Sequence, residues 1–167
     1  MSSETIVTAI LLITAIVAAG VLTSTIFPAI YTVSSTVSSS SQKADQQMRT
    51  DMVIVNTFAD TSNGAQVWLK NTGASRISMN DLNMSIIFIG GPNDFETMSK
   101  DDLQSSPPAL GGWSYEILDN TNTYWDEGET LHVIIKSSKI PAASGDVVYF
   151  QFVLFDGTKR SEQFTVS

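Results

Sequence analysis

Residues 6–31 read IVTAILLITAIVAAGVLTSTIFPAIY, a run of 26 residues without a charged side chain. In an α-helix this run would extend over about 39 Å, which exceeds the ~30 Å of hydrocarbon in a bilayer. A helix that is apolar on every side is stable only where lipid or other helices surround it. The run therefore predicts an anchoring helix and not part of a soluble core.

The charged residues divide the chain into an apolar part and an aqueous part. No charged residue occurs between Thr5 and Gln42, whereas all nine Lys and Arg lie from Lys43 onward, with all but one of the 17 Asp and Glu. The net charge of −8 disfavours nucleic acid as a partner, because phosphates require a basic surface. Since the chain has no cysteine, a disulfide framework and a thiolate metal site are excluded.

The first four residues, MSSE, do not resemble the basic start of a secretory signal peptide. The apolar run is also longer than the 7–15 residues typical of such a signal. We therefore expect the helix to stay in the protein. Small residues that favour close helix packing cluster in this helix: Ala15, Ala18, Ala19 and Gly20. Small residues are also common in any membrane helix, so a packing face and an ordinary membrane helix both stay open as interpretations.

The Ser-rich residues 32–41 are either a flexible linker or a continuation of the helix. Val33, Val37, Ala44 and Met48 are spaced by four, seven and four residues, which keeps one apolar side on a continuing helix. The sequence therefore predicts a hydrophobic N-terminal helix over residues 1–50, about 70 Å long, and a separate domain over residues 51–167.

The second domain has the pattern of a β-sandwich of immunoglobulin-like size. Its segments rich in β-branched and aromatic residues are short, no helix pattern separates them, and Asn63-Gly64 and Asp156-Gly157 mark turns. The predicted strands are residues 52–59, 66–70, 85–89, 113–118, 131–136, 147–155 and 163–166. We expect residues 147–155 to form an interior strand, because they are apolar on both faces, and the last strand to lie beside it at an edge that could pair with another protein.

Two further expectations concern single features of this domain. Residues 90–112 contain three prolines and two Gly pairs, which predicts an irregular loop that is either a binding loop or disordered. Trp68 alternates with Gln66 and Lys70, so its own face is mixed; we nevertheless predict that it belongs to the core and has no ligand-binding role.

No pattern in the sequence indicates an enzyme or a cofactor site. His132 is the only histidine and lies within a predicted strand, with no nucleophile motif around it. Four carboxylates are weak candidates for a calcium site, although they lack EF-hand spacing and equally suit a solvated turn: Asp119, Asp126, Glu127 and Glu129. Asn83 begins the sequon Asn-Met-Ser, a candidate glycosylation site if the domain is exported.

An uncharged N-terminal helix with an early glutamate, followed directly by a small β-domain, resembles the archaellin and type IV pilin-like superfamily. Within it, SSETIVTAILLITAIVAAGVL and RTDMVIVNTFADTSNGAQVWLKNTGASRI are similar to the FlaG family of archaellum accessory proteins. The resemblance covers about the first 80 residues, and the rest of the chain matches only in general character. The early glutamate, Glu4, stands slightly away from the usual position, and no basic leader precedes it.

The resemblance implies a structural component of the archaellum that anchors or organises the filament in the cell envelope, with the β-domain outside the cytoplasmic membrane. Its implied partners are a FlaF-like protein, the archaellin filament, the surface layer and membrane lipid. An alternative within the superfamily is that the chain itself polymerises with identical subunits into a filament. A second alternative is a membrane-tethered β-sandwich that binds a ligand, for which a cluster of aromatic residues would be evidence. By the positive-inside rule, Lys43 and Arg49 on the C-terminal side of the helix would place the β-domain in the cytoplasm. Two basic residues are weak evidence, so charge alone does not fix the topology, and the resemblance outweighs it.

Overall fold

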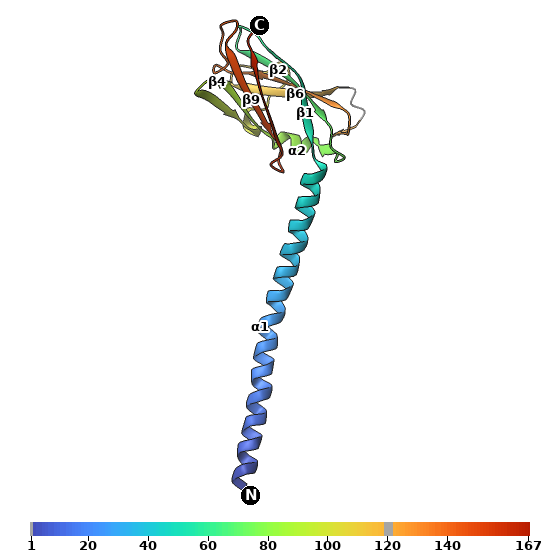
Figure 1. Ribbon diagram of the computed structural model, residues 1–167, viewed down its shortest axis with the longest axis vertical. Coiled ribbons are helices and arrows are strands. Elements are labelled where there is room, and N and C mark those ends of the chain that lie inside the picture. Colours follow the sequence, from blue (N-terminus) through green and yellow to red (C-terminus); the bar gives the residue numbers. More distant parts are fainter. Residues whose placement is uncertain (1, 119–121) are drawn as a thin grey trace. The chain divides into compact units, whose positions relative to one another are not determined.

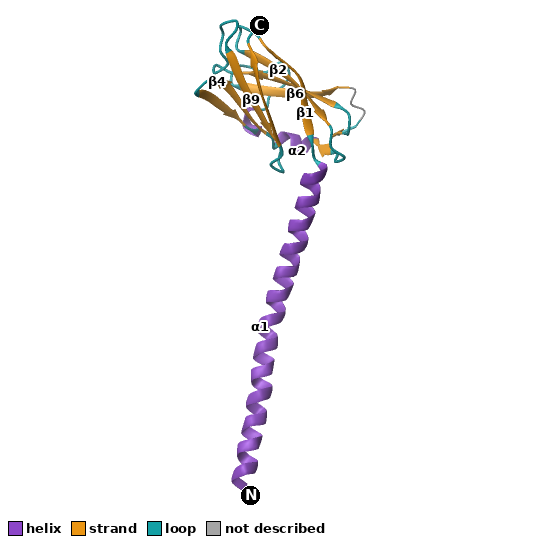
Figure 2. Cartoon of the chain, in the orientation of Figure 1, coloured by secondary structure: helices purple, strands orange, loops and turns teal. Residues whose placement is uncertain are grey.

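The computed structural model describes residues 2–118 and 122–167 (Figure 1). The chain begins with one long helix, α1 (Ser2–Arg49), of 48 residues, or about 72 Å. The predicted continuation of the helix through the Ser-rich residues 32–41 is confirmed. Strands then follow almost without interruption, and the expected helix-plus-sandwich fold is confirmed (Figure 2).

Many hydroxyl groups of α1 donate hydrogen bonds to its own backbone. Thr14 Oγ1 donates to the carbonyl of Ile10 at 2.7 Å, and Thr23 Oγ1 donates to that of Ala19 at 2.8 Å. Thr32, Thr36 and several serines repeat this pattern along the helix. Because such bonds leave no hydroxyl hydrogen in need of an outside partner, a helix rich in Ser and Thr can lie in apolar surroundings.

The first sheet has four antiparallel strands in the order β1-β2-β8-β6. They are β1 (Met52–Ala59), β2 (Gly64–Asn71), β8 (Thr130–Lys136) and β6 (Gly112–Leu118). The predicted hairpin is confirmed: Ala59 pairs with Ala65 around a turn in which Asn63 has a φ of +62°. Asn tolerates this left-handed conformation better than most residues, which is why Asn-Gly marked the turn.

The second sheet is also antiparallel and has the order β10-β9-β4-β5. Its strands are β10 (Lys159–Thr165), β9 (Val147–Val153), β4 (Ile86–Gly91) and β5 (Asp94–Met98). As expected, β9 is an interior strand and β10 is the edge strand beside it. A small third sheet pairs β3 (Ile77–Ser78) with β7 (Tyr124–Trp125), and α2 (Met79–Asn83) follows β3.

The prediction that residues 90–112 form one irregular loop is wrong. Gly91 and Asp94 pair across a tight turn in which Pro92 comes first and Asn93 has a φ of +67°. The residues after this turn form β5, and the 3-10 helix Lys100–Asp102 follows. Pro and Gly here make a hairpin turn, which their composition alone did not distinguish from a loop.

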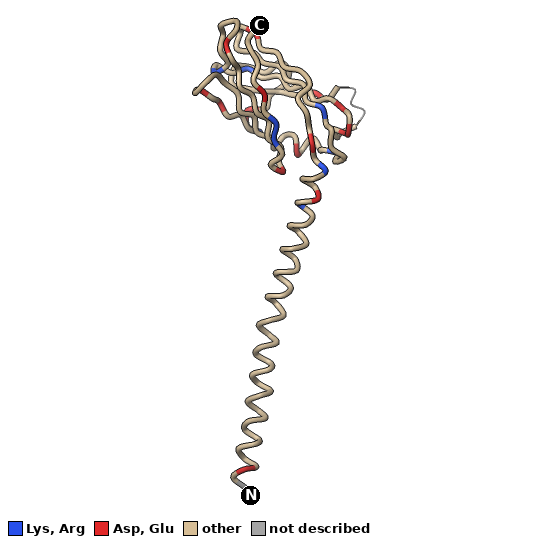
Figure 3. The backbone as a smooth tube through the Cα atoms, in the orientation of Figure 1, with Lys and Arg blue, Asp and Glu red and all other residues tan. Residues whose placement is uncertain are grey.

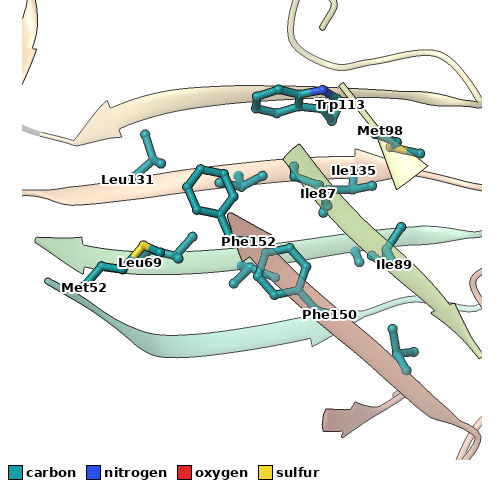
Figure 4. Close-up of a cluster of buried hydrophobic side chains, with 14 of the residues drawn as sticks. Met52, Leu69, Ile87, Ile89, Met98, Trp113, Leu131, Ile135, Phe150 and Phe152 are labelled. Carbon is teal, nitrogen blue, oxygen red and sulfur yellow. The ribbon is translucent and has the colours of Figure 1, made fainter. Parts of the chain in front are cut away.

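The core lies between the two four-stranded sheets (Figure 4). Leu69 and Leu131 of the first sheet and Phe150 and Phe152 of the second are almost completely buried. Each such side chain contributes about 1.5–3 kcal/mol through its removal from water. Trp113 is fully buried as well, and its indole N–H donates to the carbonyl of Ser99 at 2.8 Å.

The chain divides into two compact units, Met1–Ala44 and Asp45–Ser167. We call the second unit the head. By its contacts, the last turn of α1 belongs to the head, together with both large sheets.

Candidate functional site

The first functional feature is the surface of α1. All its side chains from residue 3 to residue 49 are exposed, and the large apolar ones between Ile6 and Val37 retain 45–71% of their accessible area. Charged residues lie only near its two ends (Figure 3). In the described part of the chain, this is the one helix long and apolar enough to cross a membrane. The helix therefore requires lipid or other helices around it.

The predicted small-residue face lies within this surface. Ala15, Ala18 and Ala19 are exposed, and a Cβ on Gly20 would meet no atom within 4 Å. The positions are open to a neighbouring helix, and packing against one stays a prediction.

The second feature is the neck, residues 45–52, where α1 leads into β1. The carbonyl of Asp51 accepts hydrogen bonds from the N–H groups of Thr72 and Gly73, both at 3.0 Å, and the carbonyl of Arg49 accepts one from Ser75 at 3.1 Å. These bonds come from the loop after β2. Within the head, the neck is therefore attached to the sheets along its backbone, and not only through the chain connection.

A buried side chain organises the same loop. The Asn71 side chain is fully buried; its amide donates to the carbonyls of Ser75 and Trp125 at 3.0 Å, and its oxygen accepts from Gly73 N–H at 3.0 Å. Because a buried amide with all these partners fixes one backbone conformation, the loop is held in place against the neck.

The C-terminal hairpin contacts the neck from another direction. Arg160 Nε donates to the carbonyl of Met52 at 2.8 Å, and its guanidinium forms an ion pair with Asp51. Gln47 donates to the carbonyl of Asp156 in the turn between β9 and β10. Two segments far apart in the sequence thus meet at the neck.

The candidate calcium ligands do not form a metal site in the described part of the chain. Asp119 lies outside the described residues. Asp126 makes a bidentate ion pair with Arg76, with N–O distances of 2.9 and 3.0 Å, which holds the pKa of that carboxyl below its ordinary value. Glu129 accepts a hydrogen bond from Asp126 N–H at 2.8 Å, whereas Glu127 is exposed. No group of three His, Asp or Glu among the described residues could hold a metal ion.

Asn83, the glycosylation candidate, is the last residue of α2. Its side-chain oxygen accepts a hydrogen bond from the Tyr115 hydroxyl at 2.7 Å, and partial burial raises the pKa of that hydroxyl. Ser85, the third residue of the sequon, is fully buried. Glycosylation of the folded head would therefore require this region to open, and the modification stays a prediction.

The prediction that Trp68 belongs to the core is wrong. Its neighbours Val67 and Leu69 are fully buried, so Trp68 lies on the outer face of the first sheet, where it is half-buried. Its ring stacks on His132, its partner on β8, with centroids 4.5 Å apart and planes at 4°. The strand alternates with a period of two, and only one face of it meets the core.

His132 itself has two side-chain partners on the same face. Its Nδ1 lies 3.1 Å from a carboxylate oxygen of Glu116, and its Nε2 lies 3.0 Å from the side-chain oxygen of Gln66. Both ring nitrogens are thus engaged across the three strands β6, β8 and β2. The arrangement links three neighbouring strands and fits cross-strand stabilisation.

The outer face of the second sheet carries a groove of about 800 Å³, which we call the aromatic groove. Two adjacent cross-strand rows supply most of its lining. Phe88 pairs with Gln151 and Thr97 in one row, and Tyr149 pairs with Gln163 in the next. The full lining is Phe88, Phe95, Thr97, Tyr149, Phe150, Gln151, Ser161, Glu162 and Gln163.

Sequence reasoning did not find this groove, for two reasons. Phe95 was assigned to the predicted loop of residues 90–112, whereas the structure places it on β5. Tyr149 belongs to residues 147–155, which are apolar on both faces, and Phe88 lies among isoleucines, so the outward direction of these two rings was not evident. Residues 86–89 read IIFI and show no polar alternation, so only the structure, in which Ile87 and Ile89 are buried, places Phe88 on the outer face.

Comparison with known proteins gives a match along almost the whole chain. The model of the archaeal-type flagellin family matches residues 2–164. An uncharacterized protein of Archaeoglobus fulgidus is 27% identical over 169 residues, which cover 99% of both chains. The superfamily resemblance found in the sequence is thereby confirmed.

Solved structures show the same fold. The archaellum periplasmic stator protein FlaG from Sulfolobus acidocaldarius is similar at a TM-score of 0.53 and 23% identity, over 69% of this chain and 99% of that one. The archaeal flagellum of Methanospirillum hungatei is similar at a TM-score of 0.66 and 15% identity, over 95% of this chain and 91% of that one. Since the family model spans both the helix and the head, the chain belongs to the archaeal-type flagellin family.

Proposed function

We propose that the chain is a structural component of the archaellum, anchored by α1 and carrying its head outside the cytoplasmic membrane. The observation that carries the proposal is the exposed apolar surface of α1. The large apolar side chains from Ile6 to Val37 retain 45–71% of their accessible area. Exposing this surface to water would cost roughly 25 cal/mol of free energy for each Å². The archaeal-type flagellin family points to the archaeal flagellum as the assembly to which this helix belongs.

Within the archaellum, we favour an accessory role close to the membrane. The head resembles the periplasmic stator protein FlaG, and FlaG has also been solved in a complex with FlaF. By analogy, the head of this chain would bind a FlaF-like β-domain, with lipid around α1 and the surface layer and the filament nearby. The edge strand β10 is paired with β9 on one side only, and beyond the contact of Arg160 with β1 it would offer backbone groups to such a partner.

The alternative is that the chain is itself a filament subunit, packed through α1 against identical helices. One observation favours this role: the match to the flagellum covers 95% of the chain, therefore includes α1, and has a TM-score of 0.66, against 0.53 for FlaG. The exposed small residues Ala15 and Ala19 would then lie at the contacts between helices.

A cysteine variant separates the two roles, because the chain contains no cysteine of its own. Ser144 lies in an exposed loop of the head, so Ser144→Cys provides one reactive thiol for a gold or biotin label. In cells, the accessory role predicts label in the membrane fraction, absent along sheared filaments and cross-linked to a FlaF-like protein. Regular label along the filament would establish the subunit role instead. Label in neither fraction would contradict both roles.

A further inference from the structure

One glycine, Gly90, shapes the aromatic groove. Gly90 lies between Tyr149 of β9 and Phe95 of β5 in the same cross-strand row. Since Gly90 has no side chain, the rings of its two partners meet, with centroids 5.6 Å apart at an interplanar angle of 70°. A Cβ on Gly90 would lie 2.1 Å from the carbonyl oxygen of Asp94, so the position admits no larger residue.

The polar side chains of the groove have no internal partner. Within the described residues, no hydrogen bond engages the side chains of Gln151, Gln163, Thr97 or Ser161. Their amides and hydroxyls can both donate and accept hydrogen bonds. Neutral hydrogen-bonding groups thus alternate with aromatic rings on one concave surface.

The groove is also nearly free of charge in an otherwise acidic head. The whole net charge of −8 belongs to the head, because Glu4 and Lys43 in the rest of the chain cancel. Glu162 is the one carboxylate among the described residues that line the groove. Its cross-strand partner is Phe150, whose side chain faces the core, so Glu162 lies at the edge of the groove. Lys159 lies in the neighbouring row, opposite Val153. An uncharged ligand therefore fits this surface, because the head is acidic and the described lining of the groove contains no Lys or Arg to receive an anion.

The exposed apolar area favours a small ligand over a protein surface. On the strands of this face, the most exposed large apolar side chains are Phe95, at 51%, and Ile86, at 38%. A stable protein interface buries about 800 Å² on each partner around well-packed apolar anchors, which these two side chains do not provide. A concave groove of about 800 Å³ is instead within the usual range for small-ligand sites.

We infer that the aromatic groove binds an uncharged oligosaccharide. A sugar ring has an apolar C–H face and a hydroxyl edge, and the groove presents aromatic rings beside amide and hydroxyl groups. Phe95 and Tyr149 would contact the C–H face, and Gln151 and Gln163 would bond the hydroxyls. The inference does not depend on whether the chain is an accessory protein or a filament subunit.

The test uses the full-length protein in lipid nanodiscs, since a maltoside detergent would compete for the groove. Maltohexaose, mannohexaose and the hexamer of N-acetylglucosamine are titrated by calorimetry and by saturation-transfer NMR. At least one should bind with a Kd between about 10 μM and 1 mM, the weak range expected for a few stacking contacts and hydrogen bonds. A hexamer of galacturonate should bind at least about tenfold more weakly, because it carries negative charge.

Two substitutions locate the site, and a matched one serves as the control. Phe95→Ala and Gln151→Ala should each weaken binding by about tenfold or more. Phe58→Ala removes a ring of similar exposure, 40%, from the first sheet and should leave binding within about twofold.

Three results would overturn the inference. The first is that none of the three neutral oligosaccharides binds, and the second is that Phe58→Ala weakens binding as much as Phe95→Ala does. In the third, Phe95→Ala changes only the self-association of the protein in sedimentation, and the groove is then a contact between copies. Insertion into the nanodisc reports the anchor separately, so the proposed function is judged on a different readout.

Discussion

Gly73→Ala tests the attachment of the neck to the head. A Cβ at Gly73 would lie 2.3 Å from the carbonyl oxygen of Arg49 and 2.4 Å from the amide nitrogen of Asp51. Both contacts are with backbone atoms, which cannot rotate away as a flexible side chain can. The loop and the neck would have to separate by about 1 Å before the methyl group reached an ordinary contact distance.

The expected cost follows from the hydrogen bonds that this separation weakens. They run from Gly73 and Thr72 to Asp51 and from Ser75 to Arg49, and each contributes about 0.5–1.5 kcal/mol to stability. Their loss would lower the free energy of unfolding of the head by about 2–4 kcal/mol. Because Ala restricts the unfolded chain by about 0.4–1 kcal/mol, the net loss should be about 1–3 kcal/mol. For a domain of this size, Tm should fall by about 3–15 °C.

Thermal unfolding of the full-length protein, followed by tryptophan fluorescence, measures this effect, because all three tryptophans lie in the head. Gly20→Ala is the matched control, since a Cβ there meets nothing within 4 Å, and it should leave the Tm of the head unchanged. A Tm for Gly73→Ala within about 1 °C of wild type would refute the close attachment of the neck.

Three further changes have expected outcomes. Asp126→Asn should reduce the stability of the head at pH values above the ordinary carboxyl pKa and have little effect at more acidic pH. The ion pair with Arg76 lowers the pKa of Asp126, so the stability that this pair contributes is lost only as pH falls through the lowered pKa. Urea unfolding at several pH values measures this dependence. Ala19→Leu should weaken helix association, measured by cross-linking in nanodiscs, if the small residues form the packing face, whereas Val17→Leu should not; equal effects would leave only a general membrane role. A fragment of residues 45–167 should be soluble, folded and rich in β-structure by circular dichroism, and more stable than one of residues 53–167, which loses the neck; equal stabilities would contradict the neck contacts.

The helix and most strands could be predicted because they depend on local patterns. An uncharged run from residue 6 to residue 31 indicates its apolar surroundings without further information. Residues 147–155 are apolar on both faces, which correctly placed β9 inside its sheet. The turns at Asn63 and Gly157 followed from residues that tolerate a positive φ.

The candidate sites could not be predicted because they depend on which strands become neighbours. Phe88, Phe95 and Tyr149 come together only through the pairing of β4 with β5 and with β9, which no local pattern specifies. Trp68 was assigned to the wrong face because its own row contains both polar and apolar residues, and its partner His132 lies 64 residues later on β8. The role of Gly73 likewise requires knowing that its loop meets the neck.

The central claim is that α1 lies in an apolar medium while the head faces the outside of the cell. Single cysteines at Ile13 in α1 and at Ser144 in the head can each be treated in intact cells with a membrane-impermeant maleimide, since no native cysteine competes. We predict that Ser144→Cys reacts at once and that Ile13→Cys reacts only after the membranes and filaments are dissolved. Labelling of Ile13→Cys in intact cells, or protection of Ser144→Cys until the cells are lysed, would contradict the account.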